Sequence, residues 1–113
     1  MPKRKLDPLP AVAFQIMLAL SAGELHGYAI MREVEEQTGG RLRLGPGTLY
    51  GSIQALLEGK LIEEVDRPAE TERRERYYRL TVAGRKLARS EAEKMADVLR
   101  VARARKILRG DYV

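Results

Sequence analysis

Residues 45–62 read Gly-Pro-Gly-Thr-Leu-Tyr-Gly-Ser-Ile-Gln-Ala-Leu-Leu-Glu-Gly-Lys-Leu-Ile, and this stretch predicts a short helix with one apolar side. Pro46 suits the first helical position, because the N–H that proline lacks is one that the first turn leaves unpaired, so Gly45 falls at the N-cap. Gly59 stands where a left-handed residue commonly ends a helix. The apolar side has helical spacing and comprises Leu49, Ile53, Leu56 and Leu57.

The opposite side of this helix consists of small or uncharged residues, namely Gly47, Thr48, Gly51, Ser52, Gln54 and Ala55. A face that meets only solvent normally carries Lys, Glu and Arg, whereas a face that enters a DNA groove needs small residues and a few hydrogen-bonding groups. Each glycine inside a helix costs about 1 kcal/mol relative to alanine. We interpret the face as a DNA-reading surface, with helix packing as the other reading of its glycines. Tyr50, at the edge of the apolar stripe, packs in the core, reaches a phosphate, or does both.

Composition narrows the class of protein. A chain of 113 residues, 44% of them hydrophobic, forms one small domain with a modest core. There is no cysteine and only one histidine, His26, which excludes a disulfide framework and a zinc site. No carboxylate pair, activated nucleophile, phosphate-binding loop or metal cluster has the spacing that catalysis requires, so we expect neither an enzyme nor a cofactor. The apolar run at residues 11–20 is too short for a membrane span or signal peptide, and we expect a cytoplasmic protein.

The formal net charge of +5 lies at the two ends of the sequence. Residues 81–113 hold most of the excess of Lys and Arg, while residues 22–60, which include the small-faced helix, are close to neutral. Nucleic-acid binding depends on where the charge lies more than on its sum. Net charge alone therefore gives only weak support for a nucleic-acid partner.

Periodicity and turn residues divide the rest of the chain into helices and a hairpin. Leu42 and Leu44 alternate with arginines, which predicts a short half-buried strand. His26 is interpreted as a helix-entry residue, with a group that titrates near neutral pH as the other reading. The charged loop at residues 66–75 contains no glycine, so we expect a hairpin with a mobile tip. We predict helices over 9–21, 26–38 and 82–109, and strands over 61–65 and 76–81.

The last of these helices would be about 40 Å long, which is long for so small a domain. An apolar stripe that projects beyond a compact body needs a cover, and a second copy of the chain is the simplest one. We therefore predict a homodimer. The stripe comprises Leu87, Ala88, Ala92, Met95, Val98, Leu99 and Ala102.

The order of the elements predicts a fold that is mainly α with a small β-hairpin, namely a winged helix-turn-helix followed by one long C-terminal dimerisation helix. Residues 1–81 would form the winged helix-turn-helix and residues 82–113 the dimerisation helix and tail, in one compact unit. Four segments, between about residue 9 and residue 100, resemble in order and spacing the PadR family of transcriptional regulators, in its smaller subgroup. They are Leu25-His26-Gly27-Tyr28, Gly47-Thr48-Leu49-Tyr50, Gly59-Lys60-Leu61-Ile62 and Tyr77-Tyr78-Arg79-Leu80-Thr81-Val82-Ala83-Gly84.

This resemblance implies a homodimeric repressor that binds an inverted-repeat operator. It places Thr48 and Tyr50 against the DNA, and it gives the hairpin a basic wing with Arg73, Arg74 and Arg76. Some family members respond to an aromatic or drug-like effector. The chain departs from the family pattern in two places: many relatives have Ser or a similar capping residue where this chain has Gly45, and this wing mixes acids with its arginines. The second departure bears on the strength of the wing contact. The first and last helices would form the dimer through Val12, Ile16, Leu87, Met95, Val98, Leu99 and Ala102.

The complete expected DNA-binding set is Gly47, Thr48, Tyr50, Gly51, Ser52, Gln54, Arg73, Arg74 and Arg76. An alternative is a winged-helix module that binds protein and not DNA, which the near-neutral wing keeps open. The expected partners are double-stranded DNA, a second copy of the chain and a small aromatic effector, with no membrane. The effector stays open, because the chain has no Trp and one Phe.

Overall fold

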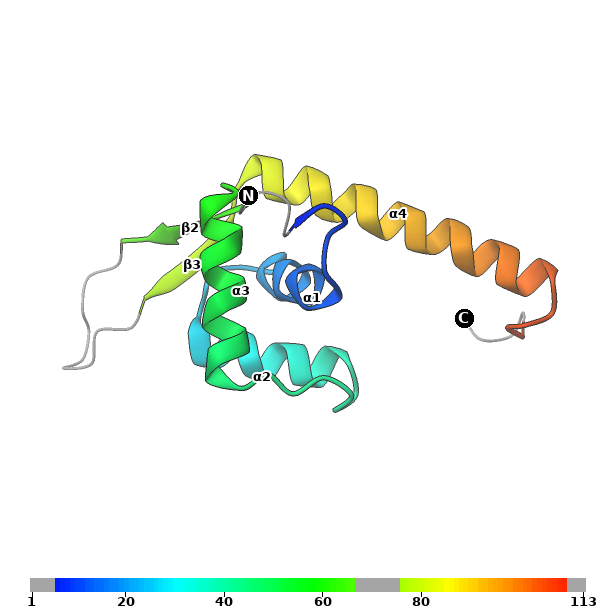
Figure 1. The fold of residues 1–113 in the computed structure, drawn as a ribbon, viewed down its shortest axis with the longest axis horizontal. Helices are drawn as coiled ribbons and strands as arrows, with labels where there is room; N and C mark the ends of the chain where they lie inside the picture. Colours follow the sequence, from blue (N-terminus) through cyan, green and yellow to red (C-terminus); the bar gives the residue numbers. More distant parts are fainter. Residues whose placement is uncertain (1–5, 67–75, 110–113) are drawn as a thin grey trace.

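The computed structural model describes residues 6–66 and 76–109, which form four helices around a small antiparallel sheet (Figure 1). The elements are α1 (Ala11–Leu20), β1 (Leu25–His26), α2 (Gly27–Gln37), α3 (Pro46–Glu58), β2 (Ile62–Val65), β3 (Tyr77–Leu80) and α4 (Val82–Ala104). The strand order is β1-β3-β2, so the predicted hairpin is present and β3 lies at the centre. This arrangement is a winged helix-turn-helix, as the sequence predicted.

The core is built around α1, which packs against α2, α3 and α4. Most residues of α1 are buried, because it has apolar side chains on nearly every side. Each large side chain removed from water contributes about 1.5–3 kcal/mol to the free energy of unfolding. This packing fixes the position of α3 relative to the hairpin. The largest fully buried side chains are Ile16, Met17, Leu20, Ile30, Val34, Leu49, Ile53, Leu56 and Ile62.

The strand predicted at residues 42–44 is not formed, and these residues lie in the loop between α2 and α3. Leu44 is buried and Leu42 packs against the core, so their alternation reflects an extended loop that seals the interior. The Leu42 N–H donates to Thr38 Oγ1, which holds the loop in place. The third strand is β1, which occupies the edge of β3 that a strand at 42–44 would need.

His26 is a helix-entry residue, as predicted, since it stands at the N-cap of α2. Its Nδ1 accepts the Ala29 N–H at 3.2 Å. The imidazole also makes an edge contact with the Tyr77 ring, whose centroid is 5.4 Å away. The start of α2 is thereby tied to β3.

The start of α3 agrees with the sequence and its end does not. Pro46 begins the helix after an extended Gly45. Gly59 has a φ of −79°, and Lys60 instead takes the left-handed conformation with a φ of 60°. The prediction of a left-handed Gly59 was wrong. Glycine instead leaves room for a neighbouring side chain, since a Cβ at residue 59 would lie 2.8 Å from Leu6 Cδ1.

The last helix, α4, runs from the sheet past α1 and beyond the helical body (Figure 1). The long axis of the molecule is accordingly 54 Å. The helix ends at Ala104 and not at residue 109 as predicted. Lys106, with a φ of 64°, ends it, and the sequence carries no glycine or proline there to signal the stop.

Candidate nucleic-acid interface

The small-residue side of α3 is the candidate surface. In α3, Gly47, Thr48, Gly51 and Gln54 are exposed, while the leucine and isoleucine side faces the core, as the sequence predicted. Gln54 Nε2 donates to Glu58 Oε2 at 3.3 Å, which leaves its amide oxygen available. The exposed face carries no Lys or Arg, so whatever it binds is recognised by close approach and by neutral hydrogen bonds.

One edge of this face turns toward the start of the chain. Ser52 and Ala55 are half-buried there, and with Gly47, Thr48 and Gly51 they line an open groove of about 310 Å³. The opposite wall is formed by Leu6, Pro10 and Ala13. Ser52 is therefore less accessible than the rest of the predicted set.

Tyr50 lies at the other edge of the face, where α3 meets α2 and the hairpin. Its side chain is 52% exposed, and the ring lies over Gly27, the first residue of α2. Burial raises the pKa of the neighbouring Tyr78 above its ordinary value of 10.0, with further increases from Glu64 and Tyr50 that Arg76 opposes. The Tyr50 ring therefore packs at the margin of the fold, against the start of α2, and about half of the residue stays exposed. Its contact with a phosphate stays a prediction.

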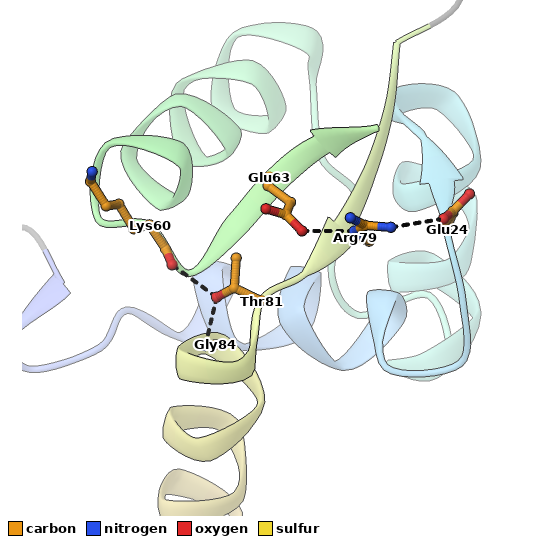
Figure 2. A network of polar contacts seen from close by, with 6 residues as sticks. All are labelled: Glu24, Lys60, Glu63, Arg79, Thr81 and Gly84. Atoms are coloured by element: carbon orange, nitrogen blue, oxygen red, sulfur yellow. Dashed lines mark hydrogen bonds and ion pairs between the residues drawn. The ribbon is translucent and has the colours of Figure 1, made fainter. Parts of the chain in front are cut away.

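Arginines at the base of the hairpin are paired with acids, as Figure 2 shows for Arg79. Arg79 on β3 donates from Nε to Glu63 of β2 at 2.7 Å, and its Nη1 lies 3.7 Å from Glu24 before β1. The hydrogen bond to Glu63 raises the pKa of Arg79. Arg76 lies 4.0 Å from Glu64. Because these pairs are exposed to solvent, they add little stability, but they place acids next to the two arginines of the described part of the hairpin.

The remaining basic residues of the expected wing, Arg73 and Arg74, lie outside the described residues, as does the loop tip that was expected to be mobile. Arg76 is described, and its side chain is 76% exposed at the start of β3. Tyr77 and Tyr78 divide as alternation predicts, with Tyr78 buried and Tyr77 half-buried.

A second junction fixes α4 to the end of α3 (Figure 2). Thr81 Oγ1 donates to the Lys60 carbonyl at 2.8 Å and accepts the Gly84 N–H at 3.0 Å, so one hydroxyl links the turn after α3 to the first turn of α4. The Thr81 N–H also donates to the Leu61 carbonyl at 3.1 Å. The candidate surface and α4 are therefore held in a fixed relation.

The predicted dimerisation residues fall into two groups. Met95, Val98 and Leu99 are exposed on the part of α4 that projects from the body, and Ala102 is half-buried. The others pack within this chain: Val12 and Leu87 are half-buried against the core, and Ile16 is fully buried in it.

Two features of the site were not predicted from the sequence. The sequence pattern assigns no individual role to Gly27, because nothing local shows that a tyrosine 23 positions later lies against it. Arg79 was assigned no role, although cross-strand pairing of the predicted hairpin places it opposite Glu63 and could have indicated the ion pair.

No helix within residues 6–66 and 76–109 is long and apolar enough to cross a membrane. Nor do they contain a group of three or more His, Asp or Glu side chains that could hold a metal ion.

Sequence comparison provides the family. The model of the transcriptional regulator PadR-like family matches residues 16–90. An uncharacterised 37.1 kDa protein of transposon TN4556 from Streptomyces fradiae is 47% identical over 81 residues, which cover 72% of this chain and 22% of that protein. The chain therefore spans about a fifth of the length of this curated relative.

Solved structures share the fold. A transcriptional regulator from Clostridium thermocellum is 25% identical, with a TM-score of 0.69 over 82% of this chain and 87% of that one. A PadR family regulator from Clostridium difficile is 21% identical, with a TM-score of 0.74 over 84% and 97%. Bacillus subtilis PadR, in complex with operator DNA, is 22% identical, with a TM-score of 0.65 over 74% and 47%. From the family match and the winged helix-turn-helix together, the chain belongs to the PadR-like family of transcriptional regulators.

Proposed function

We propose that this chain is a sequence-specific DNA-binding repressor that acts as a homodimer on an inverted-repeat operator. The observation that carries the proposal is the exposed, uncharged, small-residue face of α3 beside the hairpin. A helix can approach base edges closely only where its side chains are small, and neutral donors and acceptors can then read them. The operator complex of B. subtilis PadR, which has the same fold, supports this use of the scaffold.

In this proposal α3 enters the major groove. Gly47 and Gly51 allow the approach, while Thr48 and Gln54 offer hydrogen bonds to bases or backbone. The Tyr50 hydroxyl donates a hydrogen bond to a DNA phosphate. Ser52 contributes at the margin because it is half-buried. The hairpin contacts the DNA backbone beside the major groove through Arg73, Arg74 and Arg76.

The homodimer is supported by the projecting part of α4, where Val98 is 66% exposed. An apolar helix face outside the core is unfavourable in water, and a two-fold partner would cover it with the same face of its own α4. Two α3 helices related by this axis read two half-sites of opposite direction, which is why an inverted repeat is the matching operator.

The test is selection of DNA from a random duplex pool by the purified protein. We expect an inverted repeat to be enriched, with an affinity that falls steeply as salt increases. The variant with Thr48→Ala and Tyr50→Ala should bind the selected duplex at least about tenfold more weakly, since each lost hydrogen bond to a charged or base group costs about 1–3 kcal/mol. The variant should stay folded, with only a modest drop in melting temperature, because Thr48 is exposed and Tyr50 is only about half-buried.

Ser90→Ala on α4 is a matched control, because it also removes an exposed hydroxyl but lies away from the interface. Its affinity should equal that of the wild type. Full specific binding by the Thr48 and Tyr50 double variant would refute the site assignment.

The second candidate function is a protein-binding module. It is supported by the ion pairs at the base of the hairpin. Arg79 and Arg76 face acids of the hairpin and its neighbourhood, so the described part of the wing offers little free positive charge. A protein contact centred on apolar residues would change little with salt, whereas binding to phosphates must weaken. A steep salt dependence therefore supports the DNA-binding function.

A small aromatic effector is the further partner that we propose to test. The only phenylalanine, Phe14, is buried, so a ligand would meet an aliphatic surface between subunits. Melting temperature measured against a panel of planar aromatics would reveal binding to the folded state. A flat response across the panel would mean that regulation takes another route.

A further inference from the structure

The contact between Gly27 and Tyr50 shows why one position in α2 lacks a side chain. A Cβ built on Gly27 would lie 2.5 Å from Tyr50 Oη, 3.0 Å from Cζ and 3.1 Å from Cε1. Carbon and oxygen atoms that are not bonded attract best at about 3.5–4.0 Å, so a methyl group cannot share this space with the ring. Only glycine lets the tyrosine occupy its observed position.

Backbone conformation is not the reason for this glycine. Gly27 is the first residue of a regular helix and does not have the positive φ of Gly39 or Gly40, so alanine suits its backbone. The atoms that oppose the missing Cβ belong to the far end of the Tyr50 side chain. A methyl group at residue 27 would therefore turn the ring away and leave the helices in place.

The position that the ring would lose is the junction of three elements. The Tyr50 side chain reaches from α3 across the start of α2, and α2 begins directly after β1, whose Leu25 and His26 pair with Tyr78 and Tyr77 of β3. The tyrosine is about half-exposed, so part of its side chain faces solvent at this junction.

We infer that Gly27 is a positioning residue for DNA recognition. The space left by its missing side chain lets the Tyr50 ring lie where its hydroxyl can bind a DNA phosphate between α3 and the hairpin. This inference rests on the proposed DNA-binding function. It gives Gly27 a role that is exercised only through Tyr50, so the two residues must be thermodynamically coupled in binding.

A double-mutant cycle tests the coupling, with the duplex that the wild type selects from a random pool as the probe. Gly27→Ala and Tyr50→Phe should each weaken binding by about tenfold, since each removes one hydrogen bond to a charged group. In the Tyr50→Phe background, Gly27→Ala should change affinity by less than about twofold, because no hydroxyl remains to be misplaced. Melting temperatures should stay close to the wild-type value.

Two further measurements separate this role from a structural one. The slope of log affinity against log salt should be unchanged in Gly27→Ala, because a neutral hydroxyl releases no counterions. Gly45→Ala is the control glycine, since nothing lies within 4 Å of its added Cβ, and it should retain wild-type affinity.

The outcomes distinguish the inference from the proposed function. Failure of the wild type to enrich any sequence contradicts DNA binding itself. Enrichment by the wild type, combined with additive losses in the cycle or full affinity of Gly27→Ala, contradicts only the positioning of Tyr50. A crystal structure of Gly27→Ala that shows the Tyr50 ring unmoved would overturn the inference independently of DNA.

Discussion

Gly84 is the residue at which the fold depends most directly on a missing side chain. A Cβ there would collide with the Leu61 carbonyl oxygen, which is backbone and already accepts the Thr81 N–H. The clash cannot be relieved by rotating a side chain, so α4 would have to separate from the turn after α3. We expect Gly84→Ala to lower the free energy of unfolding by about 2–4 kcal/mol in urea denaturation, and a wild-type midpoint would show that the junction yields easily.

Gly51 makes the opposite prediction, because stability and binding should change in different directions. No atom lies within 4 Å of its absent Cβ, and it stands inside α3. Gly51→Ala should therefore raise the free energy of unfolding by about 0.5–1 kcal/mol through helix propensity. If the face enters a DNA groove, the same methyl group should weaken binding to the selected duplex. A variant that is stabilised and keeps full affinity would show that this glycine does not serve close approach.

At the scale of elements, the turn after α3 contains a strain that one substitution should release. Lys60 is left-handed with a φ of 60°, a conformation that costs a residue with a Cβ about 1 kcal/mol or more. The Lys60 and Leu61 N–H groups close the helix by donating to Leu57 and Leu56. Lys60→Gly should keep these bonds and raise the free energy of unfolding by about 0.5–1 kcal/mol. An unchanged or lower value in chemical denaturation would mean that the lysine side chain contributes more than its backbone costs.

The same turn shows how far the sequence determines the elements. The helices and the hairpin were predictable because periodicity is averaged over many positions. The errors concern features that only one or two residues determine. They are the left-handed residue one position after Gly59, the end of α4 before Lys106, and the strand placed at residues 42–44. The actual third strand, Leu25–His26, is too short to show a period and exists only because β3 offers it an edge.

The candidate site was predictable to the same extent. The small face of α3 could be read from spacing, since all its members belong to one helix. The groove on one side of that face and the Gly27 contact on the other both depend on residues from other elements, which periodicity cannot bring together. Ile16 belonged to the proposed dimer set for the same reason, because its apolar character does not tell an outer face from the core.

At the scale of the whole molecule, α4 divides into two parts with different neighbours. Its first turns pack on the body through Leu87 and Ala88, and its projecting part leaves Met95, Val98 and Leu99 exposed. Within residues 6–66 and 76–109, the start of the stripe is packed against the body and the rest of it has no cover. If a second copy supplies that cover, the spacing of the two α3 helices depends on a surface far from any DNA contact.

This dependence leads to a prediction in which assembly and DNA binding fail together. Val98→Glu should place a charge in the proposed interface and shift the protein to a monomer in analytical ultracentrifugation, because an unpaired buried charge is strongly unfavourable. Ala96→Glu, on the same helix about 105° from the centre of the stripe, is the control and should remain a dimer. The monomer should keep its fold by circular dichroism, since Val98 is 66% exposed in the single chain. Its affinity for the inverted repeat should fall toward that for one half-site, and a monomeric variant that still bound the full repeat with wild-type affinity would separate DNA recognition from dimerisation.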